Sequence, residues 1–173
     1  MSKLQNMRAI EIPKFRAVSS GPKPIDQIFG ETSDFLTWVK NHESMLKKHI
    51  YEPQDFLWHE NNDINQSVWV IAINDDVTEA NTTPYEIIEF QGGMFLVATA
   101  DENDNDDLNE TVNCMLEWIS KSDVFEKGDY PISGMCNMPN PDGVIDKALN
   151  IAQQQIYLPL KFSTKEDFTT HIL

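Results

Sequence analysis

The fold is decided by one stretch near the end of the chain, QQQIYLPLKF at Gln153–Phe162. Apolar residues occupy every second position, which predicts a strand with one buried face. The apolar positions are Ile156, Leu158, Leu160 and Phe162, and they alternate with Gln155, Tyr157, Pro159 and Lys161. A face that met only water would rarely combine a tyrosine with an uncharged amide and a proline. The second face of this strand is therefore expected to line something other than solvent.

The rest of the chain divides into similar segments. Alternation predicts strands at 7–19, 55–60, 66–73, 85–100 and 132–138, and a 3.6-residue period predicts helices at 25–48 and 107–120. Pro13 interrupts the first strand, and Gly92-Gly93 interrupts the strand at 85–100. The polar residues 61–63 predict a hairpin turn, residues 74–84 a loop, and Asp107 with Glu110 a capping box. Residues 163–173 are expected to form a tail.

The two halves of the chain match at an offset of 80 residues. Positions that are apolar in both halves are Phe15 and Phe95, Leu36 and Leu116, Trp38 and Trp118, and Val39 and Ile119. We predict a single domain over residues 1–173, built from two strand–helix–hairpin units at about 7–74 and 85–162. The predicted fold class is α+β, with pseudo-twofold symmetry. One antiparallel sheet would carry two long helices on one face and a ligand groove on the other. Trp38 and Trp118 are expected in the core.

Strand alternation also predicts the residues of the groove. If Val68, Val70 and Ala72 face the helices, Trp69 faces the groove together with Gln155 and Tyr157. The predicted ligand-binding residues are Trp69, Gln155 and Tyr157, with Trp58, Phe95 and Met135 as further wall residues. The alternative is that these side chains pack under the loop at 74–84. No catalytic residue is assigned.

Composition and charge exclude several classes of protein. With 28 acidic and 13 basic residues the formal net charge is −15, so direct nucleic-acid binding is not expected. The two cysteines form no metal or disulfide pattern, and the acidic run at 101–107 lacks the glycine and glutamate of a calcium loop. No metal and no cofactor is expected. Without a signal peptide or membrane-spanning run, the chain is expected to be cytoplasmic.

Four segments resemble the gyrase-inhibitor-like (GyrI-like) family, the effector-binding domain of AraC-type and MerR-type multidrug-sensing transcription regulators. They are IPKFRAV at 12–18, GGMFLV at 92–97, LEWI at 116–119 and IYLPL at 156–160. The resemblance covers about residues 7–162. It implies a duplicated strand–helix–hairpin fold whose central groove binds lipophilic compounds. The chain is expected to be a free-standing domain of this kind, which senses or sequesters a small lipophilic or aromatic molecule.

The resemblance also implies two alternative functions. Some family members are similar to hydrolases of cyclopropanoid DNA-alkylating compounds, and others inhibit DNA gyrase through a protein contact. The family commonly has a groove glutamate two residues before the tyrosine of its last strand, where this chain has Gln155. An amide is neutral and cannot act as a general base, which argues against the hydrolase. A protein partner and the oligomeric state stay open.

Overall fold

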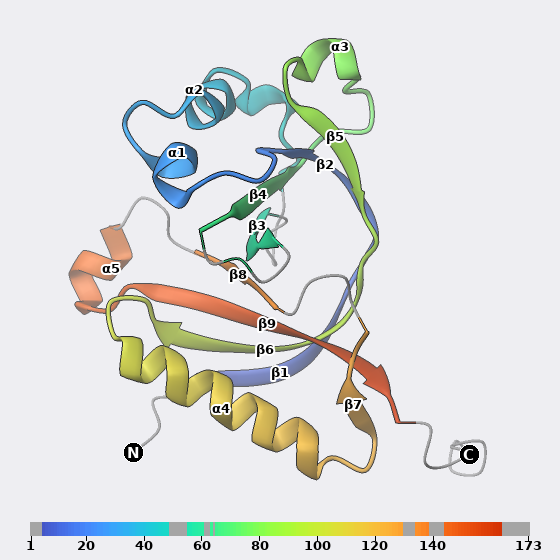
Figure 1. Cartoon of the computed structure of the whole chain (residues 1–173), viewed down its shortest axis with the longest axis vertical. Coiled ribbons are helices and arrows are strands. Elements are labelled where there is room, and N and C mark those ends of the chain that lie inside the picture. The colour runs from blue at the N-terminus through green and yellow to red at the C-terminus, as the bar shows by residue number, and fades with distance from the viewer. Residues whose placement is uncertain are drawn as a thin grey trace.

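The computed structural model describes residues 5–48, 55–60, 63, 65–129, 134–138 and 144–163. These residues form nine strands in one curled antiparallel sheet (Figure 1). The order across the sheet is β1 (Gln5–Ile12), β6 (Gly93–Asp101), β9 (Gln153–Phe162), β8 (Met135–Asn137), β3 (Asp55–His59), β4 (Ser67–Ala72), β2 (Phe15–Ser19) and β5 (Glu86–Phe90). The remaining strand, β7 (Phe125–Lys127), pairs with the end of β9. The α+β fold class predicted from the sequence is confirmed.

The strand order has an internal symmetry. If β1, β2, β3 and β4 are exchanged for β5, β6, β8 and β9, the order across the sheet is reversed and otherwise unchanged. The interruption at Pro13 separates β1 from β2, and Gly92 precedes β6. The two interruptions lie side by side, because Ile12 is the register partner of Gly93. This arrangement is the one expected for two related halves.

Helices cover the outer surface of the sheet. The covering helices are α1 (Ile25–Phe29), α2 (Asp34–Asn41) and α4 (Asn105–Lys121). The chain also forms a 3-10 turn at Glu43–Met45 and two short helices, α3 (Glu79–Thr82) and α5 (Val144–Leu149). The single helix predicted at 25–48 is wrong, because the chain breaks at Gly30 and restarts at Ser33. The Ser33 side chain caps α2 by accepting a hydrogen bond from the Leu36 N–H at 3.0 Å. The segments α3, α5 and β7 were not predicted, because they are too short for a periodic pattern.

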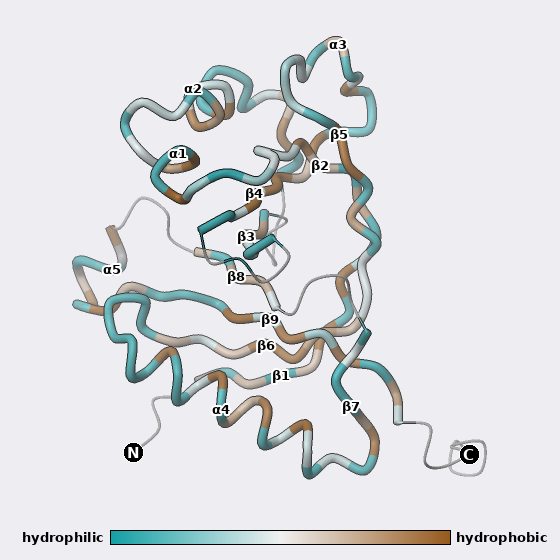
Figure 2. Tube along the Cα trace, in the orientation of Figure 1, coloured by the Kyte–Doolittle hydropathy of each residue, from teal (hydrophilic) through white to brown (hydrophobic). Residues whose placement is uncertain are grey.

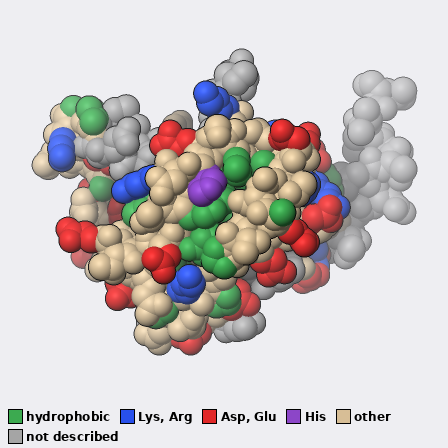
Figure 3. Space-filling view, turned by 90° about the horizontal axis from the view of Figure 1, so that it is seen from above, with side chains coloured by type: hydrophobic (Ala, Val, Ile, Leu, Met, Phe, Trp, Pro, Cys, Tyr) green, Lys and Arg blue, Asp and Glu red, His purple; other side chains and the backbone are tan. Residues whose placement is uncertain are grey.

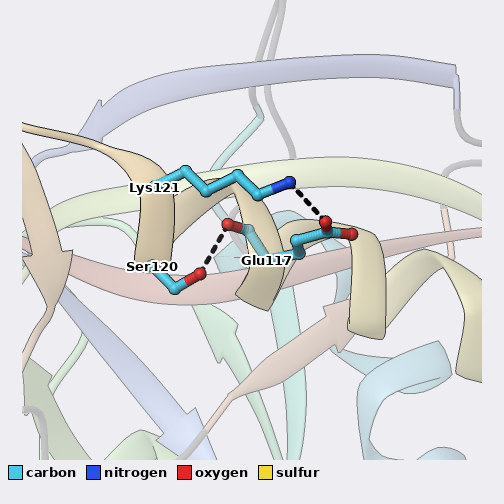
Figure 4. A network of polar contacts seen from close by, with 3 residues as sticks. All are labelled: Glu117, Ser120 and Lys121. Atoms are coloured by element: carbon cyan, nitrogen blue, oxygen red, sulfur yellow. Dashed lines mark hydrogen bonds and ion pairs between the residues drawn. The ribbon is translucent and has the colours of Figure 1, made fainter.

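The N-terminus of α4 differs from its prediction. Asp104, not Asp107, is the N-cap, and its carboxylate accepts hydrogen bonds from the Asp106 and Asp107 N–H groups. Asp107 instead accepts from the Asp101 N–H at 2.9 Å, which joins the helix to the end of β6. On the solvent side of α4, Lys121 contacts Glu117, and Ser120 donates to the Glu117 carbonyl (Figure 4). The Lys121 hydrogen bond lowers the pKa of Glu117, but the exposed pair contributes little to stability.

Buried hydrophobic clusters lie on both faces of the sheet. Hydrophobic residues recur along the strands and along α4 (Figure 2). On the outer face, register places Ala98, Ile156, Cys136, Leu57 and Trp69 in one row across five strands. Ala98 and Ile156 belong to the cluster under α4, whereas Trp69 packs in the cluster under α1 and α2. The two helical layers therefore cover the same face, as predicted. The inner face holds a third cluster, rich in aromatic residues.

The two corresponding tryptophans have different environments. Trp38 is buried in the cluster under α2, as predicted. Trp118 is 36% exposed and stacks on Phe125, so its predicted place in the core is wrong. Met115 and Ile119 are the residues of this part of α4 that turn toward the sheet.

The face with α1, α2 and α3 shows hydrophobic side chains around a histidine, with acidic groups at the periphery (Figure 3).

Two buried threonines should respond to valine in opposite ways. Thr111 is fully buried on α4, and its hydroxyl has no hydrogen-bond partner among the described residues. Thr111→Val should therefore stabilise the protein by about 1 kcal/mol, because a buried unpaired hydroxyl is removed without changing side-chain shape. The measurement is urea-induced unfolding.

The matched control is Thr82→Val. Thr82 is equally buried, but its hydroxyl donates to the Tyr85 carbonyl at 2.9 Å. Losing this bond should destabilise the protein by about 1–2 kcal/mol. If both variants shift stability in the same direction, the assignment of the Thr111 hydroxyl as unpaired is contradicted.

Candidate functional site

An apolar groove runs beside α4, over the central strands where the two halves meet. We call it the α4 groove. Its volume is about 390 Å³, which is within the usual range of small-molecule pockets. Its lining is Leu57, Trp58, His59, Leu108, Asn109, Val112, Leu116, Lys127, Gly134, Met135, Cys136, Gln154, Ile156 and Leu158. The groove exists because α4 packs over β6 and β9 and leaves β8 and β3 uncovered on this side.

The walls and floor of the α4 groove come from different elements. One wall is the α4 face that carries Leu108, Val112 and Leu116, spaced by four residues. The floor contains Ile156, Cys136 and Leu57, which are neighbours in one row of the sheet. These apolar side chains offer dispersion contacts and a region from which water is easily displaced.

A few polar groups stand among these apolar walls. The described lining contains Lys127 and His59 but no aspartate or glutamate. Burial raises the pKa of the Cys136 thiol to about 11, although a hydrogen bond with Gln154 opposes the shift. The thiol therefore stays protonated at neutral pH and is not poised as a nucleophile. The polar groups offer hydrogen bonds and one fixed positive charge.

Behind the groove, the inner face of the same strands is tightly packed. Tyr157 is 1% exposed, and its ring meets Phe56 edge-on with centroids 5.2 Å apart. The Tyr157 hydroxyl donates to the Gln155 side-chain oxygen at 2.6 Å. In the next strand, the Asn137 amide donates to both the carboxylate and the carbonyl of Asp55 at 2.9 Å. These contacts fix the positions of β8 and β9, which form the floor of the α4 groove.

Solved structures with the same architecture include three with clear overall similarity. A hydrolase from Listeria innocua has 12% identity and a TM-score of 0.59, with 91% of this chain and 92% of that chain covered. SAV2435 bound to tetraphenylphosphonium has 10% identity and a TM-score of 0.52, with 91% of this chain and 94% of that chain covered. EcmrR in a complex with DNA has 12% identity and a TM-score of 0.62, covering 90% of this chain and 57% of that chain. No protein-family model matches the sequence, and no curated protein matches it significantly.

The chain has the GyrI-like fold. The resemblance noted in the sequence is thus confirmed at the level of the fold. Identities of 10–12% show only a shared fold, so the function of this chain has to be argued from its own residues.

The structure divides the predicted ligand-binding residues into two groups, and Trp69 belongs to neither. Trp58 and Met135 line the α4 groove and also contact the inner cluster. Phe95 and Tyr157 are buried in the inner cluster, where Gln155 binds the Tyr157 hydroxyl. The sequence analysis expected the groove on the face away from the helices, whereas the α4 groove lies beside a helix.

The orientation predicted for β4 is wrong. Trp69 lies under the helices, 4.8 Å from Phe29 and 5.6 Å from Phe35 between ring centroids, and Val68 and Val70 face the inner cluster. Its indole N–H donates to the Asp55 carboxylate at 3.4 Å. The reason is that every position of β4 after Ser67 is apolar, so alternation could not tell one face from the other.

The contribution of α4 to the site was missed. The sequence analysis predicted the helix at 107–120 from its 3.6-residue period, but it assigned none of the residues of this helix to the site. The available signal in the sequence was the width of the apolar stripe on this helix. In the structure, Leu116 is 38% exposed, whereas Met115 beside it is fully buried. An apolar face wider than its contact with the sheet leaves residues for a groove.

Among the described residues, no group of three or more His, Cys, Asp or Glu side chains could hold a metal ion. Within the same part of the chain, no helix is long and apolar enough to span a membrane.

Proposed function

We propose that this GyrI-like domain binds a small lipophilic or aromatic molecule in the α4 groove. The observation that carries the proposal is a groove of about 390 Å³ with mostly apolar walls, located over the junction of the two halves. Leu108, Val112 and Leu116 on the α4 wall, with Leu57 and Ile156 on the floor, would supply most of the apolar contact area. Trp58 and Met135 also belong to the lining, but they pack against the inner cluster as well. The inner cluster, with Phe95, Gln155 and Tyr157, would hold these strands in place.

The charges of the groove favour a neutral ligand over a cation. Its described lining carries Lys127 and His59 and no aspartate or glutamate. Gln155, at the position where the family commonly has a glutamate, binds the Tyr157 hydroxyl behind the groove. A lipophilic cation would therefore meet no opposite charge in the groove, although the net charge of −15 would attract it over longer distances. SAV2435 was solved with the cation tetraphenylphosphonium. We expect this domain to bind neutral aromatic molecules more tightly than that cation.

Binding of a small lipophilic or aromatic molecule would allow this domain to sense that molecule or to sequester it. The fold is shared with the regulator EcmrR, whose chain in the DNA complex is longer than this one. A ligand-sensing role linked to transcription is therefore part of the proposal.

The test is fluorescence titration with the neutral probe N-phenyl-1-naphthylamine. Leu116→Lys should weaken binding at least tenfold, because it removes a hydrophobic contact worth about 1.5–3 kcal/mol and places a charge in the groove. Val124→Lys is the matched control, since Leu116 and Val124 are both 38% exposed and only Leu116 lines the groove. The control should keep its affinity.

Two results would overturn the proposal. One is equal affinity of the wild-type protein and Leu116→Lys for the probe. The other is saturable binding of tetraphenylphosphonium that is tighter than that of the neutral probe, which would contradict the inferred preference. Thermal melting of both variants shows whether any loss of binding reflects loss of fold.

A further inference from the structure

A second hollow lies at the N-terminal end of α4 and shares none of the residues that line the α4 groove. It is a cavity of about 160 Å³ lined by Thr99, Ala100, Asp101, Asp107, Leu149, Ile151 and Gln153. Its walls come from the end of β6, the first turn of α4, the end of α5 with the residues after it, and the start of β9. An apolar cavity of about 150 Å³ can hold a ligand as large as benzene, so this one has room for a small organic molecule.

The chemistry of the cavity is set by Asp107. This side chain is 4% exposed, and one carboxylate oxygen accepts from the Asp101 N–H at 2.9 Å. The other oxygen has no hydrogen-bond partner among the described residues. The first turn of α4 favours a negative charge at this position, because the helix dipole is positive there. A buried carboxylate with an unpaired oxygen is costly, and a cationic donor in the cavity would relieve that cost.

A wider acidic depression adjoins the cavity, since Asp101 and Ile151 line both. Its volume is about 710 Å³, and four carboxylates line it, from Asp101, Asp104, Asp106 and Asp146. Lys147 is the one basic residue in its described lining. Burial raises the pKa of neighbouring Glu102, and the charges of Asp146 and Asp101 add to the shift. The negative potential here would attract a second positive charge.

We propose that this end of α4 is a binding site for a short aliphatic diamine. One ammonium group would donate to the unpaired Asp107 oxygen, and the methylene chain would lie against Leu149 and Ile151. The second ammonium group would lie in the acidic depression. The site shares no residue with the α4 groove, so the diamine proposal can be tested independently of the proposed function.

The experiment is calorimetric titration at low ionic strength with 1,4-diaminobutane, 1-aminobutane and 1-butanol. The diamine should bind most tightly, the monoamine more weakly, and the alcohol not at all. Asp107→Asn, which keeps the shape and one acceptor oxygen, should weaken diamine binding at least tenfold. The control Glu110→Gln removes the same charge from an exposed position of the same helix and should change the affinity less than twofold.

A second pair of variants tests diamine binding at this site if Asp107→Asn does not fold. Ile151 is 40% exposed at the rim of both hollows, so Ile151→Lys should be tolerated and should abolish diamine binding by repulsion. Phe162→Lys makes the same change at a residue that lines neither hollow and should bind normally. The proposal is overturned if no amine binds, if Asp107→Asn or Ile151→Lys keeps full affinity, or if Glu110→Gln loses as much as Asp107→Asn.

Discussion

Gly92→Ala is expected to destabilise the protein by about 3 kcal/mol or more, because it combines backbone strain with a steric clash. Gly92 has φ +71°, a conformation that residues with a side chain rarely adopt. A Cβ atom there would lie 2.4 Å from the Ile12 oxygen and 2.7 Å from the Lys14 nitrogen. Both neighbours are backbone atoms at the interruption between β1 and β2, so neither can turn away. Urea-induced unfolding measures the loss.

Gly21→Ala separates the two contributions. Gly21 has a similar φ of +66°, but a Cβ atom there would meet nothing within 4 Å. This variant should lose only about 1 kcal/mol, which is the cost of the backbone conformation alone. Equal losses at Gly92 and Gly21 would show that the two strand interruptions do not pack tightly against each other.

Phe56→Ala should destabilise the protein by about 3–5 kcal/mol, the usual cost of removing a buried aromatic side chain. Phe56 is 1% exposed and lies on β3, where the first half of the chain meets β8 of the second. Its ring contacts Phe90 at 5.4 Å and Tyr157 at 5.2 Å between centroids, so it links strands of both halves. The variant should therefore weaken the junction on which the α4 groove is built. Thermal and urea unfolding both report the effect.

The control for Phe56 is Phe162→Ala. Phe162 is 59% exposed at the end of β9, where it stacks on Phe125. Its removal should cost no more than about 1 kcal/mol, because little apolar surface returns to water. A loss of less than 1 kcal/mol for Phe56→Ala would contradict a packed inner face and would indicate an inner cleft instead.

Local sequence patterns predicted the strands well. The bounds predicted for β9 agree with the structure, and the interruptions at Pro13 and Gly92 are where the sequence indicated them. These features depend on residues adjacent in the chain, since alternation, proline and glycine act on the local backbone. The helix at 25–48 was less predictable, because Gly30 and Ser33 break it within a pattern that is otherwise helical.

Of the predicted ligand-binding residues, Trp58 and Met135 line the open groove, and Trp69 does not. Trp58 and Met135 lie on β3 and β8, which α4 leaves uncovered. Trp69 lies on β4, a strand that is apolar after Ser67 and lies between two clusters. Only the packing of α1 and α2 against β4 decides which side of that strand Trp69 occupies.

The sequence by itself determined the strand and helix types, the two interruptions and the likeness between halves, because each depends on short-range backbone preferences and residue spacing. The tertiary structure decided the face of each apolar strand, the position of the α4 groove and the unpaired oxygen of Asp107. Those properties depend on which segments, distant in the chain, pack together when the sheet curls. Alternation cannot specify them where both faces of a strand are buried.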